Sequence, residues 1–319
     1  MIKTPKFWHS KNLISLLLWP FSLLYWMVFS IKSYFDIQKK FNTKIICVGN
    51  AIAGGAGKTP SALMLGKILL KNNYKIAYAC KNYLSIIESP TKVKPHHSPP
   101  QVIEEAILLS KVADTFVAKN IIDAIAMANK YSYDYIITDD GLQNNKFLKN
   151  LSILVMDGKI GVGNNMMLPA GPMREPLKKA LSKSNIIFMI GEDKHSLSKQ
   201  LADKKVIKIS PKFKLLKAKK TGKHYLAFTG IAYPQKFFNS LEASNIEIKN
   251  KIEFPDHHLY SEKDIAVLLE KEKSTNSRLI TTEKDLVKIP KKYHKDISYL
   301  EIELIPDNKS LLLNILKNI

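Results

Sequence analysis

Short runs of consecutive apolar residues alternate with amphipathic stretches along most of the chain. Strands buried on both faces are predicted where these runs are rich in aliphatic residues, at 45–48, 75–80, 115–118, 133–139, 153–157 and 186–190. Helical periodicity separates them, for example over 63–70, 102–110 and 121–131. This alternation predicts an α/β fold, with a mostly parallel sheet of the P-loop NTPase type, helices on both faces and ligands at the carboxyl ends of the strands.

A second, smaller α/β unit follows the first. Residues 225–230 and 278–282 are predicted as further strands, and the lysine-dense stretch 202–223 is predicted as a connector. A chain of 319 residues is long for one hydrophobic core. We therefore expect an N-terminal anchor (1–35), a P-loop core domain (36–220) and a C-terminal domain (221–319) that completes the active-site cleft. A stretch rich in proline, histidine and lysine at 89–100 is expected to be a mobile surface loop.

The N-terminal run 13–31 is apolar apart from three serines and is about as long as a helix that crosses a bilayer. Pro20 lies within it and is expected to break it into two short helices. Trp19 and Trp26 suit the headgroup zone of a membrane. An interfacial membrane-associated helical anchor is therefore favoured over a spanning helix, a cleaved signal peptide or the core helix of a soluble protein.

Charge points to an anionic partner. The chain has 49 Lys and Arg against 28 Asp and Glu, a net charge of +21. No compact basic run interleaved with aromatic residues appears, so an anionic membrane surface is favoured and no nucleic acid is expected. The chain has two cysteines, Cys47 and Cys80, which cannot build a disulfide framework, so a reducing compartment is expected.

A glycine-rich segment directly follows the first strand. Residues 49–59 read Gly-Asn-Ala-Ile-Ala-Gly-Gly-Ala-Gly-Lys-Thr, in which Ile52 stands where the strict P-loop pattern has glycine. Main-chain amides of such a turn hold nucleotide phosphates, Lys58 reaches the β- and γ-oxygens, and the Thr59 hydroxyl faces Mg²⁺. An ATP or GTP site is predicted from Ile52, Ala53, Gly54, Gly55, Ala56, Gly57, Lys58 and Thr59.

Two acids close the strand at 133–139. Asp139 and Asp140 stand where a parallel nucleotide-binding sheet places the acid that holds Mg²⁺, so they are predicted to complete the metal shell begun by Thr59. The alternative is an Asp-Gly pair, Asp140-Gly141, that only caps a turn.

Two further segments carry candidate chemistry. Arg174, in the turn-rich loop 168–176, offers a planar set of donors for phosphate, and the alternative is an ion pair with Glu175 or another surface acid. His257 lies beside an acid in Phe-Pro-Asp-His-His (254–258), where it can be part of a polar cluster or an ordinary surface histidine. A less favoured alternative is a metal site built from the histidines His96, His97, His257 and His258.

Taken together, six blocks resemble the tetraacyldisaccharide 4'-kinase (lipid A 4'-kinase) family. They lie at 49–60, 139–143, 168–176, 228–238, 254–258 and 281–285. The resemblance implies a P-loop kinase at the inner membrane that uses ATP and Mg²⁺. It implies transfer of the γ-phosphate to the 4'-hydroxyl of an acylated glucosamine disaccharide 1-phosphate, at the cytoplasmic face of the bacterial inner membrane.

The resemblance also implies roles for particular residues. A histidine at the place of His257 works with an acidic base, which is Asp in most of the family and Glu104 in this chain. Two other departures are Lys81-Asn82 in place of Arg-Gly and Asn144 in place of His. The expected catalytic set is Glu104, His257, Lys58 and Arg174. A membrane-bound ATPase switch with little lipid kinase activity is the alternative function, and a nucleic-acid-binding ATPase is less favoured.

Overall fold

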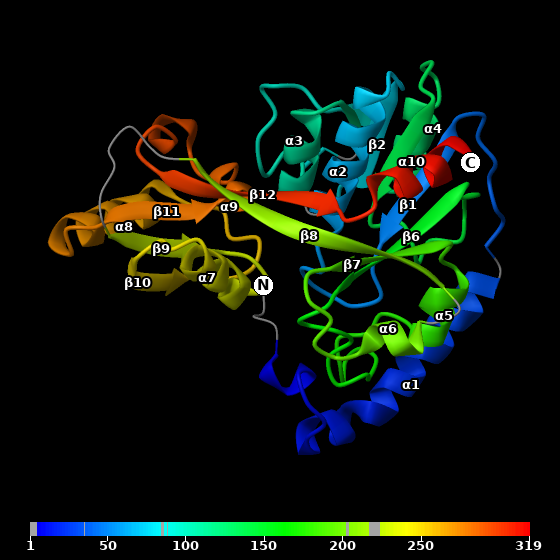
Figure 1. The fold of residues 1–319 in the computed structure, drawn as a ribbon, viewed down its shortest axis with the longest axis horizontal. Helices are drawn as coiled ribbons and strands as arrows, with labels where there is room; N and C mark the ends of the chain where they lie inside the picture. Colours follow the sequence, from blue (N-terminus) through cyan, green and yellow to red (C-terminus); the bar gives the residue numbers. More distant parts are fainter. Residues whose placement is uncertain (1–4, 35, 84–85, 88, 202–203, 217–223) are drawn as a thin grey trace.

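The computed structural model describes residues 5–34, 36–83, 86–87, 89–201, 204–216 and 224–319. Its strands are β1 (Lys44–Gly49), β2 (Ile76–Lys81), β3 (Thr91–Lys92), β4 (Asp114–Ala118), β5 (Tyr135–Asp139), β6 (Leu151–Asp157), β7 (Ile186–Ile190), β8 (Lys205–Leu216), β9 (Tyr225–Thr229), β10 (Ile248–Glu253), β11 (Arg278–Thr282) and β12 (Ser298–Pro306). Within the described residues they form one 12-stranded sheet, in the order β10-β9-β11-β12-β8-β7-β6-β1-β5-β2-β4-β3 (Figure 1).

Helices cover both faces of this sheet. They are α1 (Leu13–Tyr34), α2 (Lys58–Lys71), α3 (Glu104–Ser110), α4 (Ile121–Ala128), α5 (Leu177–Ser182), α6 (Leu197–Gln200), α7 (Pro234–Ala243), α8 (Glu262–Ser274), α9 (Glu283–Leu286) and α10 (Lys309–Lys317), with 3₁₀ turns at Lys6–Trp8 and Lys291–Tyr293. In β1, Ile46 packs into the cluster under α2 and α3, whereas Ile45 packs under α4 on the other face. The predicted α/β class, with a mostly parallel sheet, is confirmed.

The core half of the sheet, from β8 to β4, is parallel throughout. Register aligns the ends of β1 and β5, because Cys47 lies opposite Thr138 and Val48 opposite Asp139. The loop after β1 and the acids after β5 therefore leave the sheet side by side. The stretch 89–100, expected to be a loop, includes the short edge strand β3, which pairs antiparallel to β4.

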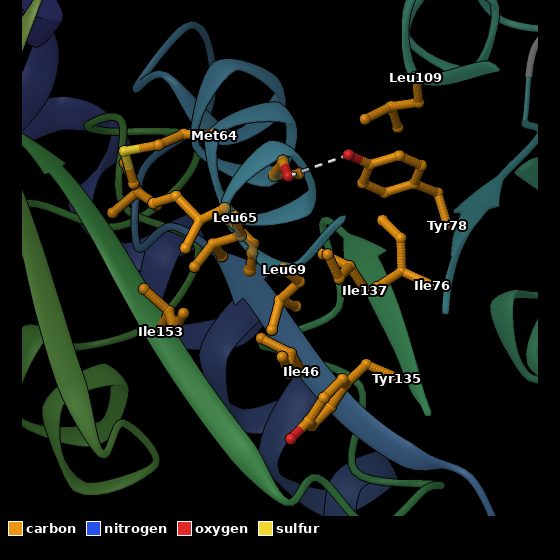
Figure 2. Close-up of a cluster of buried hydrophobic side chains, with 14 of the residues drawn as sticks. Ile46, Met64, Leu65, Leu69, Ile76, Tyr78, Leu109, Tyr135, Ile137 and Ile153 are labelled. Atoms are coloured by element: carbon orange, nitrogen blue, oxygen red, sulfur yellow. Dashed lines mark hydrogen bonds between the residues drawn. The ribbon is translucent and has the colours of Figure 1, made fainter. Parts of the chain in front are cut away.

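Close packing fixes α2 on the sheet. Leu65 and Leu69 of α2 are fully buried against strand residues such as Ile46 (Figure 2). Gly66 lies so close to Tyr78 that a Cβ atom there would come within 1.8 Å of the Tyr78 hydroxyl. That hydroxyl donates a hydrogen bond to the carbonyl of Ala62, 3.3 Å away (Figure 2). The first turn of α2 therefore has a fixed position relative to β1 and β5.

Two long strands join the halves of the sheet. Strands β8 and β12 pair antiparallel from Tyr299 opposite Leu216 to Pro306 opposite Ile209. The predicted connector at 202–223 is thus wrong for β8, although 202–203 and 217–223 lie outside the described residues. In β8, lysines alternate with half-buried or buried apolar residues. Such a partly exposed strand is as rich in lysine as a linker, which is why the sequence did not predict it. The division at 35 and 220 stays a prediction.

Helix α1 is continuous from Leu13 to Tyr34 with Pro20 inside it, so the predicted break is wrong. Proline removes one hydrogen bond of a helix and bends it, but the apolar turns on either side keep helical backbone. The window 13–31 is long and apolar enough to cross a membrane, and 11% of it is buried, which is far too little for a core helix. Figure 1 shows α1 along the outside of the core half.

Candidate functional site

The loop between β1 and α2 has the backbone of a phosphate-binding turn. Gly54 and Gly57 have φ of +99° and +91°, a left-handed region that favours glycine, and Lys58 begins α2. Ile52, at the position of the missing glycine, is buried and bridges to Met173, and the Ala53 amide donates to a carbonyl of the same 168–176 loop. The departure from the strict pattern therefore serves packing below the loop. The amide-lined turn at 54–57 is intact.

Lys58 lies between an amide and an acid. Its ammonium donates to Asn50 Oδ1 at 3.1 Å and lies 3.5 Å from a carboxylate oxygen of Asp140. Burial lowers the pKa of Lys58, while the neighbouring Asp140 opposes this shift. A buried ammonium held at the start of a helix, next to main-chain amides, is suited to an anionic ligand.

Asp139 is buried with half of its carboxylate unused. Thr59 Oγ1 donates to Asp139 Oδ2 at 2.6 Å, whereas Asp139 Oδ1 is buried and has no hydrogen-bond partner among the residues that the structure describes. Burial raises the pKa of Asp139 to about 6, although Lys58 and Thr59 act in the opposite direction. A hydroxyl and a free carboxylate oxygen side by side are oxygen donors of the kind that Mg²⁺ prefers.

In contrast to Asp139, both carboxylate oxygens of Asp140 accept hydrogen bonds. Arg174 Nη1 donates to both of its oxygens, at 2.7 and 2.8 Å, and Asp140 has φ of +67°. Burial would raise its pKa, but Lys58 and Arg174 outweigh burial and bring the pKa to about 2. Of the alternatives for an ion pair of Arg174, Glu175 is wrong, because it is fully buried and accepts from Lys183 at 2.9 Å, whereas a pair with another acid is present. Arg174 is paired with the second member of the acid pair.

The second half of the sheet brings His257 to Glu104. His257 Nδ1 lies 2.5 Å from Glu104 Oε1 at the start of α3, although 153 positions separate the two residues in the chain. Lys284 of α9 lies 3.6 Å from Glu104 and 2.6 Å from Glu105. Burial would raise the pKa of Glu104, but His257 and Lys284 outweigh it and bring the pKa to about 2. Glu105 also has a small electrostatic effect on the pKa of Lys58, so the Glu104 cluster lies near the phosphate loop.

The histidine metal site does not form. Among the described residues, one group of acids and histidines has the spacing of a metal site, Glu104, Glu105 and His257, and the ammonium of Lys284 already lies against its two acids. His96 and His97 contact each other in the 89–100 loop, and His258 contacts Asp264 at 3.2 Å. The four histidines are therefore not gathered in one place.

Sequence reasoning missed two cationic residues of the second half. Lys236, at the start of α7, lies 2.5 Å from Asp157 and donates to the carbonyl of Gly55 in the phosphate loop at 3.1 Å. Lys284 completes the group around Glu104. Both lie within blocks, 228–238 and 281–285, that carried the family resemblance. Those blocks were the one available signal, because a lysine among 49 basic residues has no distinguishing pattern.

Comparisons with known proteins agree with one another. The family model for tetraacyldisaccharide-1-P 4'-kinase matches residues 14–319. Tetraacyldisaccharide 4'-kinases of Rickettsia akari and Rickettsia typhi are 34% and 35% identical over 312 residues, which is 97% of this chain and 94% and 96% of theirs. The enzyme of Paramagnetospirillum magneticum is 33% identical over 322 residues, 98% of this chain and 97% of its own.

A solved structure has the same fold. The crystal structure of the "apo" form of LpxK from Aquifex aeolicus in complex with ATP superposes with a TM-score of 0.77 at 22% identity, over 96% of this chain and 99% of that one. On the family match and on the identity to these relatives, the chain belongs to the tetraacyldisaccharide 4'-kinase family.

Proposed function

We propose that this protein transfers the γ-phosphate of ATP to the 4'-hydroxyl of a tetraacyldisaccharide 1-phosphate, a step of lipid A biosynthesis. The observation that carries the proposal is the joining of two clusters in one site. The phosphate loop and the acid pair come from the core half, and His257 and Lys284 come from the second half to meet Glu104. Family membership across nearly the whole chain supports the same reaction.

Phosphoryl transfer depends mainly on positioning and on neutralising charge. The amides of 54–57 and the Lys58 ammonium hold the phosphates. Thr59 and Asp139 would hold Mg²⁺, because the free Asp139 oxygen and the adjacent hydroxyl fit it. Bound there, the ion would neutralise charge on the β- and γ-oxygens. Asp140 orients Arg174 and Lys58 toward the same place.

Glu104 is the proposed general base. Its pKa of about 2 keeps it ionised at neutral pH, and His257 fixes the orientation of its carboxylate. A carboxylate with so low a pKa is a weak base on its own, so the proton that leaves the hydroxyl has to be shared between Glu104 and His257, whose Nδ1 lies 2.5 Å from Glu104 Oε1. Positioned carboxylate and histidine together supply the proton acceptor that this alcohol needs.

Membrane attachment follows from α1 and from charge. The apolar outside of α1, with residues such as Leu13, Leu17 and Phe21 more than half exposed, suits a bilayer. The net charge of +21 favours an anionic membrane surface and an anionic lipid headgroup. We place the site at the cytoplasmic face of the inner membrane, where ATP is available.

The test is phosphate transfer from radiolabelled ATP to the lipid disaccharide in mixed micelles. Wild-type protein is expected to label the lipid, and Glu104→Gln is expected to lower the rate on the order of a hundredfold. Glu104→Asp, which restores the residue common in the family, should keep substantial activity. ATP hydrolysis without any labelling of lipid would instead identify an ATPase switch and overturn the proposal.

A further inference from the structure

The second half of the sheet also contains a buried carboxylate, Asp285, that is not part of the cluster of Glu104, His257 and Lys284. Asp285 is fully buried in α9 and accepts hydrogen bonds from five donors. These are Thr229 Oγ1 at 2.6 Å, Lys288 Nζ at 2.7 Å, Thr282 Oγ1 at 2.7 Å, the Gly230 amide at 3.0 Å and Tyr260 Oη at 3.1 Å. A carboxylate with this many donors is held in a single orientation.

Two of those donors belong to residues that carry the His257 turn. The carbonyl of Thr229 accepts from the Phe254 amide at 2.8 Å, and the carbonyl of Gly230 accepts from the His257 amide at 3.2 Å. Lys288 Nζ also donates to the Gly230 carbonyl, at 3.0 Å. The two ends of the turn are therefore bonded to the residues that Asp285 fixes.

The turn needs such support. His257 has φ of +59°, a left-handed backbone that is unfavourable for a non-glycine residue and persists when its surroundings hold it. Gly230 packs against the turn without space, because a Cβ atom there would lie 2.9 Å from the carbonyl oxygen of Pro255. A shift of Gly230 therefore moves the turn and the imidazole with it.

Helix α9, which contains Asp285, also orients the Lys284 ammonium beside Glu104. Thr282 caps α9 by accepting from the Asp285 amide at 2.9 Å, so side chain and main chain of Asp285 both anchor this short helix. Lys284, the preceding residue, points from α9 to Glu105 at 2.6 Å and to Glu104 at 3.6 Å. One buried acid thus supports both groups that the second half contributes to Glu104.

We propose that Asp285, with Lys288, is a positioning residue for the phosphoryl transfer: it fixes His257 through Gly230 and Lys284 through α9. It does not touch the reacting atoms. The proposal rests on the function proposed above, because its consequence is the placement of His257 and Lys284 against Glu104.

The test compares Asp285→Asn with Glu272→Gln. Glu272 is a matched control, a buried acid of the second half that accepts from the Leu279 amide and lies 3.7 Å from Arg278. Asp285→Asn is expected to lower kcat about ten- to a hundredfold, with KM for ATP unchanged within about twofold. Glu272→Gln is expected to leave both parameters near wild type.

A double-mutant cycle separates positioning from general damage. In the His257→Ala background, Asp285→Asn is expected to lower kcat by less than about fivefold more, because most of its effect passes through His257 and only the effect through Lys284 remains. Losses that simply multiply would overturn the proposal, as would an unchanged kcat. If Asp285→Asn does not fold, Thr229→Val removes one donor, and it should lower kcat with the same lack of additivity.

A readout without turnover separates this proposal from the proposed function. In protein with ¹⁵N-labelled histidine rings, the His257 signals are expected to shift in Asp285→Asn and not in Glu272→Gln. Unshifted His257 signals would refute the positioning role even if the wild type phosphorylates the lipid. Shifted signals in a protein that never labels lipid would leave the positioning intact and remove the lipid kinase function.

Discussion

Two buried carboxylates occupy similar places in the two halves of one sheet and have opposite character. Asp139 ends β5 in the core half. Within the described part of the chain, one of its carboxylate oxygens accepts from Thr59 and the other is buried without a hydrogen-bond partner. Asp285 follows β11 in the second half, and five donors surround it. Burial raises the pKa of Asp139 to about 6, whereas at Asp285 the donors and the Lys288 ammonium outweigh burial and lower the pKa.

The difference in hydrogen-bond partners shows how a buried aspartate can either bind a ligand or stabilise the fold. A buried carboxylate that lacks partners destabilises the protein, and such a group persists where a ligand completes it. A buried carboxylate with every partner in place stabilises one arrangement and leaves nothing for a ligand. We therefore propose that Asp139 is an acid that binds a ligand, whereas Asp285 serves the fold.

The largest expected effect is on turnover. Asp139→Asn removes the charge that would face Mg²⁺, and kcat for lipid phosphorylation should fall on the order of a thousandfold. Steady-state assays at saturating ATP and lipid measure it, with Glu272→Gln as the control that changes a buried acid elsewhere. Near wild-type activity in Asp139→Asn would show that the open carboxylate is not part of the reaction.

The next effect is on folding. Asp285→Asn leaves the Lys288 ammonium buried without its counter-charge, and the free energy of unfolding should fall by about 3–5 kcal/mol. Urea denaturation followed by tryptophan fluorescence gives the value. A loss no greater than that of Glu272→Gln would mean that the buried pair contributes little to the second half.

Asp139→Asn, in contrast, should raise the free energy of unfolding. The folded pKa of Asp139, about 6, lies above the ordinary 3.8, so the folded state holds the proton more tightly and stability falls as pH rises between these values. Without nucleotide or metal, Asp139→Asn should therefore be more stable than wild type by about 1–3 kcal/mol above pH 6, a gain that disappears near pH 4. Urea curves at several pH values test this, and a constant difference across pH would contradict it.

The smallest effect concerns Lys284. Its ammonium helps to lower the pKa of Glu104, so Lys284→Met should raise that pKa from about 2. Glu104 would still be ionised at pH 7, so the rate there should change by less than about fivefold, while the acid limb of the pH–rate profile moves to higher pH. An acid limb that stays in place would show that Glu104 does not govern it.

Local signals predicted the core half well. Six apolar runs, a glycine-rich turn and the acids at the end of the strand predicted at 133–139 indicated the phosphate site, because each depends on neighbours in sequence. Contacts between residues far apart in the chain could not be predicted from local sequence in the same way. Arg174 was expected to face a phosphate, Glu175 or another surface acid, and the acid it pairs with, Asp140, is 34 positions away.

The errors share a physical cause. Strand β8 has too many lysines to resemble a buried strand, and its role appears only when β12 pairs with it, from 83 to 97 positions later in the chain. The break predicted at Pro20 considered only the hydrogen bond that proline removes, and the surrounding helix tolerates that loss. Asp285 has local partners in Thr282 and Lys288, but its bonds to Thr229, Gly230 and Tyr260 join other elements and have no local signal. The partner of Lys236, Asp157, also comes from another element.

The contrast between the two carboxylates is tested most directly by calorimetric titration of ATP with and without Mg²⁺. We expect Mg²⁺ to strengthen ATP binding in wild type and in Asp285→Asn by the same factor, and to have no such effect in Asp139→Asn. An Asp139→Asn protein in which Mg²⁺ strengthens ATP binding as much as in wild type would contradict the assignment of Asp139 as the open, ligand-binding acid.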